Sequence, residues 1–276
     1  MTELAIDDLL TTQAVAIRNV HCDGGCRHKS PEECPGSTYL VFPYRGVYVR
    51  HLGRSDAVAE ANQVLFFNRS ESYRISHPLR GGDACLSIWV RDDLLLELVS
   101  REHFQEGEAV MFRRQRMNID PRTQVLAAQL RHSLSNKSIE PLEAETLTLT
   151  LIRRALGERT SHLTRATHGR LKLVDRAKLV LSSELSRRWT LVDIAGEVGV
   201  SPVYLTQTFA QVEGVPLYRY QLRLRLARAL DLLATYDDLS SLGLELGFSS
   251  HSHFTAAFRQ AYGRTPAEFQ RSAHLR

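Results

Sequence analysis

The stretch that decides the fold of the C-terminal part is "IAGEVGVSPVYLTQTFAQVEG", residues 194–214. Apolar residues recur at helical spacing on both sides of Gly199, which can supply the left-handed backbone that ends a helix. Ser201 follows at the position where a side chain can cap the next helix. Ala195 is small where two helices cross closely. The pattern predicts two short helices joined by a tight turn, which is a helix-turn-helix.

The same pattern returns in "LGLELGFSSHSHFTAAFRQAYGRTPAEF", residues 242–269. Here Gly247 and Ser250 stand at the turn and at the cap. The segment "PLYRYQLRLRLARALDLLAT", residues 216–235, separates the two copies and is long enough for a connecting helix. One helix-turn-helix pattern is a weak signal, whereas two at this separation are far more specific.

On these residues the chain resembles the AraC/XylS family of transcription regulators, from about Arg170 to Arg271. The resemblance implies an all-α domain of seven helices, residues 170–276, whose two recognition helices enter successive major-groove segments of double-stranded promoter DNA. It also implies contact with RNA polymerase. The outward faces of the two helices supply the residues that we expect to contact bases: Val203, Thr206, Gln207, Gln211, His251, Ser252, Thr255, Ala256 and Arg259.

The charge distribution fits two interpretations, a solvated basic surface or a phosphate-binding C-terminal domain. The net charge of +4 arises entirely after Gly169, and arginine provides most of the surplus. A guanidinium forms a bidentate fork that suits phosphate. Arginines on the connecting segment are candidates for phosphate contacts or for a solvated helix face: Arg219, Arg223, Arg225 and Arg228.

Residues 38–90 are rich in β-branched and aromatic runs that Gly, Pro, Asn and Asp interrupt, which predicts a small barrel or sandwich. The family resemblance implies a cupin-like sensor domain, expected over residues 1–117. Helical periodicity predicts a helical subdomain at 118–158 that can form a homodimer, and a linker at 159–169. The expected fold class is therefore α+β and multidomain: an N-terminal cupin-like β-barrel with a helical subdomain, and a C-terminal double helix-turn-helix domain.

A barrel of this size can enclose an effector. The residues expected to line its pocket are Tyr44, Tyr48, His51, Phe66, Tyr73, His77 and Trp89. A cupin-type enzyme with a helical appendage is the alternative interpretation. Cupin enzymes hold a metal with closely spaced histidines and a carboxylate, and His51, Glu71 and His77 lack that spacing. We therefore expect a regulator and no enzyme.

Three of the chain's four cysteines lie in "HCDGGCRHKSPEEC", residues 21–34. Zinc prefers four tetrahedral thiolate or imidazole ligands. The expected zinc ligands are Cys22, Cys26, Cys34 and Cys85, with His21 or His28 as substitutes for the fourth. Two alternatives remain open: a thiol redox sensor, since nearby cations lower thiol pKa values, and cysteines without a special role.

The first residues, "MTELAIDDLL", are acidic and lack a long apolar run, so they do not resemble a signal peptide. We expect a cytoplasmic protein that does not enter a membrane, in a compartment where clustered cysteines more often bind metal than form disulfides. The resulting hypothesis is a sequence-specific DNA-binding transcriptional regulator whose N-terminal domain senses an unknown effector.

Overall fold

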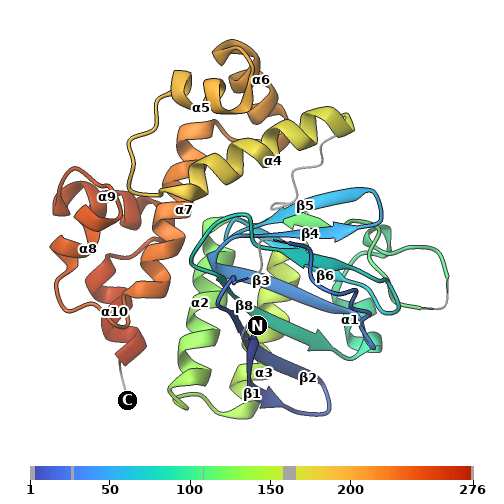
Figure 1. Cartoon of the computed structure of the whole chain (residues 1–276). Helices are drawn as coiled ribbons and strands as arrows, with labels where there is room; N and C mark the ends of the chain where they lie inside the picture. The colour runs from blue at the N-terminus through green and yellow to red at the C-terminus, as the bar shows by residue number, and fades with distance from the viewer. Residues whose placement is uncertain (1–3, 26–27, 108, 158–165, 275–276) are drawn as a thin grey trace. The chain divides into compact units, whose positions relative to one another are not determined.

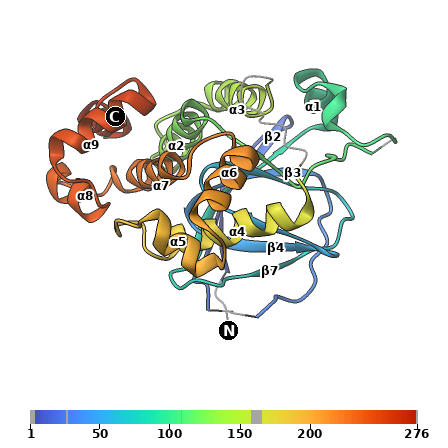
Figure 2. The same ribbon diagram turned by 90° about the horizontal axis from the view of Figure 1, so that it is seen from above.

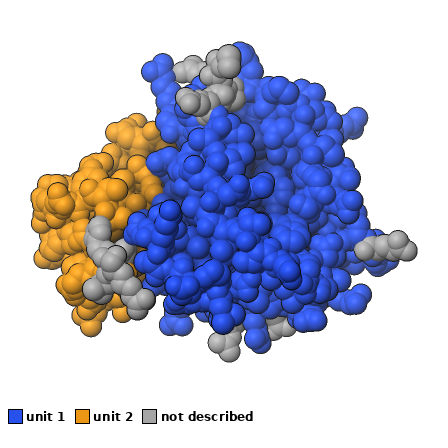
Figure 3. Space-filling view, turned by 90° about the horizontal axis from the view of Figure 1, so that it is seen from below, with its two compact units in different colours: residues 1–161, 276 blue, residues 162–275 orange. Residues whose placement is uncertain are grey.

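A computed structural model describes residues 4–25, 28–107, 109–157 and 166–274. The chain forms two compact units, residues 1–161 and residues 162–275 (Figure 3). The first, unit 1, contains antiparallel sheets and helices, and the second, unit 2, is helical. The expected combination of a β-containing N-terminal part with an all-helical C-terminal part is confirmed. Most of the expected linker, residues 158–165, lies outside the described residues.

The larger sheet of unit 1 has six antiparallel strands in the order β1-β2-β8-β3-β6-β9 (Figure 1). Its central strands are buried along most of their length, so both faces of the sheet are covered there. The strands are β1 (Leu4–Thr11), β2 (Val15–Cys22), β3 (Tyr39–Gly46), β6 (Gln63–Phe67), β8 (Asp83–Val90) and β9 (Arg116–Asn118).

One face of this sheet packs against a three-stranded sheet of order β5-β4-β7. Its strands are β4 (Tyr48–Leu52), β5 (Ser55–Ala59) and β7 (Arg74–Ser76). The core between the sheets includes Val41 and Phe67 from the large sheet and Tyr48 from the small one. Within the described residues no strand belongs to both sheets, so the expected closed barrel is not confirmed.

Helices cover the other face of the large sheet (Figure 1). Phe42 and Ile88 from the strands share one apolar cluster with Leu130 of α2 (Pro121–Ser135) and Leu151 of α3 (Pro141–Ala155). The short α1 (Asp92–Leu98) and the 3-10 turn η1 (Arg101–His103) complete this layer. The buried faces of α2 and α3 are therefore part of the core of unit 1, and a dimer contact would have to use their exposed faces.

Unit 2 contains seven helices within its described residues. Figure 2 shows α5 and α6 against α4, while α9 packs on the connecting helix α7. The helices are α4 (His168–Ser183), α5 (Leu191–Val198), α6 (Pro202–Glu213), α7 (Leu217–Leu232), α8 (Leu239–Glu245), α9 (His251–Tyr262) and α10 (Pro266–His274).

Candidate functional site

The first helix-turn-helix consists of α5 and α6. Helix α5 begins with a capping box at Thr190 and ends at Gly199, whose φ of 73° is the left-handed conformation that glycine favours. The Ser201 side chain then accepts a hydrogen bond from the Tyr204 amide at 3.3 Å, and Pro202 takes the first helical position. Ile194 packs in the core that α4, α5 and α6 share. The local signals of the sequence therefore produce the expected motif.

The second helix-turn-helix consists of α8 and α9. Gly247 has a φ of 82°, and the Ser250 side chain accepts from the His253 amide at 3.1 Å. Gly243 occupies the position of Ala195 in the first motif. A Cβ on Gly243 would lie 3.1 Å from the Cβ of Phe254, so this position must be small for α8 to approach α9.

The residues expected to contact bases lie on the outer faces of α6 and α9. Eight of them are exposed and Thr255 is half-buried. The opposite faces bury Leu205 and Phe209 on α6 and Phe254 and Phe258 on α9. The sequence correctly predicted which side of each helix faces outward, and contact with bases stays a prediction.

Some of these side chains already have partners within unit 2. The side-chain Oε1 of Gln211 accepts from Arg170 at 2.8 Å, and the Thr206 hydroxyl donates to the Pro202 backbone carbonyl at 2.9 Å. Val203 is 66% exposed, and such an apolar group suits contact with a thymine methyl. The side chains at the two ends of this α6 face therefore differ: Val203 is exposed, whereas Gln211 is hydrogen-bonded to Arg170.

Arg225 has a structural role that the sequence did not reveal. Its guanidinium donates to four backbone carbonyls, those of Leu185, Ser186, Arg187 and Gly247, at 2.7–3.3 Å. These hydrogen bonds occupy the guanidinium N–H groups that a phosphate contact would need. Among the four arginines considered on the connecting helix, Arg225 is therefore a structural residue that joins the two motifs.

The seven residues expected to line an effector pocket do not form one site. Tyr48 and Tyr73 lie between the two sheets. Phe66 belongs to the helix-side core, whereas Tyr44 contacts α2, where Cζ of Arg131 lies 3.9 Å from the centroid of its ring. The remaining three residues have different surroundings. His51 pairs with Asp56 at 2.7 Å, and His77 is buried beside Asp83. Trp89 is half-buried and lies opposite Tyr39 on the neighbouring strand. Successive strand residues face opposite sides of a sheet, so aromatic content alone could not assign them to one cavity.

A buried cation between the sheets was not expected from the sequence. Arg50 is fully buried, donates to the Phe66 carbonyl at 2.5 Å and pairs with Glu71 at 3.4 Å. Its guanidinium lies 4.1 Å from the centroid of the Phe67 ring, a cation–π distance. Burial lowers the pKa of Arg50.

A pocket of about 560 Å³ lies elsewhere in unit 1, beside η1. Its lining residues include Leu96, Arg101, Phe104, Val110 and Arg113. None of the seven expected effector-pocket residues lines it. The pocket lies in the region that follows α1, and the sequence of that region contains no pattern that predicts a pocket.

Among the described residues, Cys22, Cys34 and Cys85 of the expected zinc set do not form one group of candidate ligands. Cys34 is exposed, Cys85 is buried and Cys22 is half-buried, and within the described residues none of the three forms a disulfide. Cys26 lies outside the described residues. The Cys85 thiol donates to an Asp83 oxygen at 3.2 Å, and burial, followed by the Asp83 charge, holds the pKa of this thiol well above its ordinary value. A protonated, buried thiol is a poor redox sensor.

Instead, Cys22 lies beside two residues that the sequence analysis had not assigned to it as co-ligands. Its sulfur, a His77 ring nitrogen and an Asp83 carboxylate oxygen all lie within 4.8 Å of one another. Of the expected cysteine ligands, this group contains Cys22 alone among the described residues, together with a histidine and an aspartate.

Comparison with protein families gives a match within unit 2. Residues 194–272 match a family profile described as "Helix-turn-helix domain". The HTH-type transcriptional regulator GadX of Escherichia coli O6:H1 is 34% identical over 96 residues, which cover 34% of this chain and 35% of GadX. The HTH-type transcriptional regulator ArgR of Pseudomonas aeruginosa is 36% identical over 94 residues, covering 34% of this chain and 29% of ArgR.

A solved AraC-type regulator structure from Chromobacterium violaceum shares 31% sequence identity, with a TM-score of 0.37, and covers 40% of this chain and 98% of that one. The chain spans about a third of the length of the curated relatives it matches. Both relatives are named as HTH-type transcriptional regulators. None of the described helices has both the length and the apolar character that a membrane span requires. Residues 194–272 of this chain therefore form a helix-turn-helix domain similar to those of HTH-type transcriptional regulators.

Proposed function

We propose that the full chain is a sequence-specific regulator of transcription that binds duplex DNA through α6 and α9. The observation that carries this proposal is the pair of complete helix-turn-helix motifs. In each, a capped second helix buries one face and presents an exposed face with polar side chains. A helix of this kind fits the major groove, where side chains at its N-terminal end reach base edges.

Base contacts alone would give weak binding, because Arg259 is the only cation among the nine expected base-contacting residues. Phosphate contacts have to supply most of the affinity. Exposed arginines next to the motifs, Arg187, Arg188 and Arg219, are the candidates for these contacts. Arg225 is excluded from this role by its four carbonyl bonds.

The family resemblance supports the remaining parts of the proposal. Unit 1 acts as the sensor of an effector, and effector binding changes how unit 2 engages DNA and RNA polymerase. A homodimer would place two DNA-binding domains on one promoter. Exposed apolar residues that a dimer could cover are Leu142 on α3 and Leu4 and Ile6 on the edge strand β1.

The test is selection of duplexes from a randomised pool by the purified full chain, followed by titration of the enriched duplex at several salt concentrations. We expect a shared sequence motif and a linear fall of log K with log salt, with a slope of about −0.9 for each phosphate contact. A pool without enrichment, together with no salt-dependent duplex binding, would overturn the proposal.

A further inference from the structure

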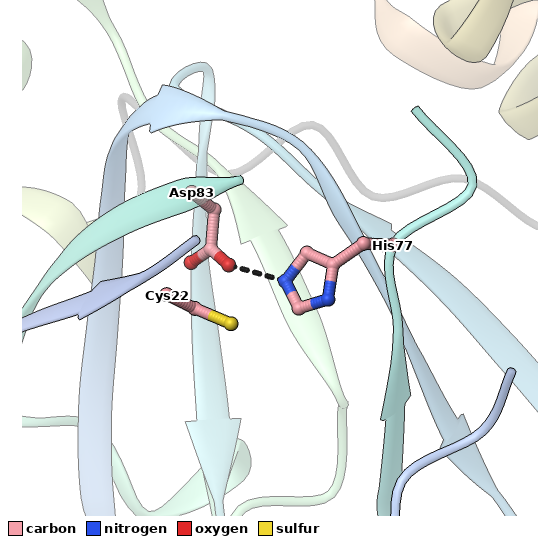
Figure 4. Close-up of side chains that lie close together, drawn as sticks. All are labelled: Cys22, His77 and Asp83. Carbon is pink, nitrogen blue, oxygen red and sulfur yellow. Dashed lines mark hydrogen bonds and ion pairs between the residues drawn. The ribbon is translucent and has the colours of Figure 1, made fainter. Parts of the chain in front are cut away.

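Cys22, His77 and Asp83 form a compact group of possible metal ligands in unit 1 (Figure 4). His77 and Asp83 are buried, and their side chains meet at 2.5 Å between Nε2 and Oδ1. Cys22 is half-buried, and its sulfur points toward the histidine and the carboxylate. Each residue offers one donor atom, and the three atoms lie within 4.8 Å of one another.

The backbone brings this group together at the ends of two paired strands. Cys22, the last residue of β2, stands directly opposite Asp83, the first residue of β8. Gly82 has a φ of 63°, and a Cβ there would lie 1.9 Å from the Cys22 carbonyl oxygen. A Cβ on Gly24 would lie 2.6 Å from the Gly82 Cα. The two chain segments therefore meet backbone to backbone, a contact that only glycines permit.

The three donors select for a particular class of metal. A thiolate and an imidazole are soft or borderline ligands that suit zinc and other first-row transition metals, whereas magnesium and calcium prefer oxygen ligands. With bonds of about 2.0 to 2.3 Å, tetrahedral zinc separates its ligand atoms by roughly 3.3 to 3.8 Å. The observed spacing allows such a shell if the Asp83 and His77 atoms move apart by about 1 Å.

Cys85 supports the carboxylate from its other side. Its sulfur donates to Oδ2 of Asp83 at 3.2 Å, while Oδ1 of Asp83 faces His77. Partners of this kind orient a ligating carboxylate and raise metal affinity. The fixed carboxylate, the buried imidazole and the more accessible thiol make this a built site with one side open toward solvent.

We propose that Cys22, His77 and Asp83 bind one zinc-class divalent metal ion, with the fourth position open to solvent or a small anion. Binding displaces the thiol proton of Cys22 to solvent, because the thiolate is the ligand, and the proton that His77 Nε2 and Asp83 Oδ1 share is displaced as well. In a second step, which rests on the proposed regulatory function, metal occupancy of unit 1 is the signal that changes DNA binding.

The test is a titration of the full chain, reduced and freed of metal by a chelator, with cobalt(II) under anaerobic conditions. We expect saturation at one cobalt per chain, with a thiolate-to-cobalt charge-transfer band and visible bands of four-coordinate intensity. Cys22→Ser should abolish the charge-transfer band, and His77→Gln and Asp83→Asn should abolish saturable binding. Cys85→Ala should keep the band and weaken cobalt binding by about 10- to 100-fold.

Cys34→Ser is the matched control, because Cys34 is an exposed thiol outside the group, and its titration should equal that of the unaltered chain. Far-ultraviolet circular dichroism of each variant separates loss of a ligand from loss of folding. Absence of a cobalt band in the folded, unaltered chain would overturn the site. So would a band that depends on Cys34 and survives in folded Cys22→Ser.

The regulatory step has its own measurement, which is duplex affinity of the same preparations with and without zinc. A change that Cys22→Ser removes and Cys34→Ser retains supports metal-linked regulation. Equal affinity in both states overturns that step and leaves the cobalt result standing. Failure of every preparation to bind duplex DNA would instead contradict the proposed function, since the cobalt spectrum does not depend on DNA.

Discussion

Arg225 donates from Nη1 to the carbonyl of Gly247 at 3.0 Å and thereby joins the connecting helix to the turn of the second helix-turn-helix. Its Nε and Nη2 atoms bond the carbonyls of Leu185 and Arg187, in the segment that leads into the first motif. One side chain therefore links both motifs. We infer that Arg225 fixes the angle at which α6 and α9 present their outer faces.

Arg225→Ala should destabilise unit 2 by about 2 kcal/mol or more, since hydrogen bonds to charged groups contribute roughly 1.5 to 3 kcal/mol each and four carbonyls lose their donor. Urea unfolding measures this. The chain has two tryptophans, Trp89 in unit 1 and Trp189 in unit 2. In a Trp89→Phe background, the fluorescence of Trp189 reports unit 2 alone.

Arg219→Ala on the same helix is the control. Arg219 is exposed, so its removal should change the free energy of unfolding by no more than about 0.5 kcal/mol. If Arg225→Ala and Arg219→Ala unfold at the same urea concentration, the carbonyl bonds of Arg225 do not hold the two motifs together.

The turn glycines of the two motifs should respond differently to alanine. Gly199 and Gly247 both have positive φ angles, which cost a residue with a Cβ about 1 to 2 kcal/mol. A Cβ on Gly199 meets no atom within 4 Å, whereas one on Gly247 would lie 2.4 Å from the Ser186 carbonyl oxygen. Gly247→Ala should therefore be the more destabilising change by urea unfolding. Equal effects would show that the turn relaxes away from Ser186.

A buried ion pair between α4 and α6 gives a further prediction. Lys178 Nζ lies 2.7 Å from Glu213 Oε1, and the side chains are 0% and 3% exposed. Asp175 is also near the ammonium, at 4.0 Å. Glu213→Leu alone should cost about 3 to 5 kcal/mol, because it leaves Lys178 charged and buried without its nearest partner.

The double change Lys178→Met with Glu213→Leu should recover most of that loss, since an apolar pair of similar volume does not require desolvation of two charges. Thermal unfolding followed at Trp189 compares the single and double variants. A double variant as unstable as Glu213→Leu would mean that packing at these positions, rather than charge, controls the stability.

The helix-turn-helix motifs were predictable from sequence because their signals are local. Gly199, Ser201, Gly247 and Ser250 each act on residues within one turn, so a short window contains both the signal and its effect. Apolar spacing then identified the buried faces of both recognition helices. The role of Arg225 was not predictable, since its acceptors are backbone carbonyls up to 40 residues away.

The ligand group in unit 1 depends on strand register, which the sequence does not specify. Cys22 meets Asp83 because β2 pairs with β8 in one particular alignment. Cysteine spacing instead suggested Cys34, which is exposed. The glycines in "HPLRGGDAC" and "HCDGG", residues 77–85 and 21–25, were the available signal, because paired glycines permit close backbone approach.

Acid should weaken unit 1 through Asp120. Burial alone would raise the pKa of Asp120, but hydrogen bonds from Arg154 and Thr123 outweigh it and lower that pKa below its ordinary value. A carboxylate with a lowered folded-state pKa stabilises the fold above its unfolded pKa, and this contribution is lost as pH falls through the folded pKa. The contribution is reduced by partial solvent exposure.

Unfolding midpoints between about pH 7 and pH 3, read from Trp89 in a Trp189→Phe background, test this. Asp120→Asn should lower the unfolding midpoint near neutral pH, and the midpoint should then fall less steeply as the pH is lowered. Asp92→Asn, at an exposed position of α1, is the control and should retain the steeper fall. An equally steep fall in Asp120→Asn would show that another group governs the acid response.

Gln207 gives the sharpest test of base reading. It is exposed on α6 between Val203 and Gln211, and a glutamine amide can form two hydrogen bonds with adenine. Gln207→Ala should weaken binding of the enriched duplex by roughly 1 to 3 kcal/mol and leave binding of a duplex changed at one base pair nearly unaltered. The salt dependence of DNA binding by Gln207→Ala should match that of the unaltered chain.

Arg219→Ala is the control, because it removes a candidate phosphate contact. It should weaken binding to all duplexes alike and reduce the slope of log K against log salt by about 1. If Gln207→Ala also weakens every duplex equally, Gln207 supports binding without reading a base, and specificity has to come from α9 or from the shape of the DNA.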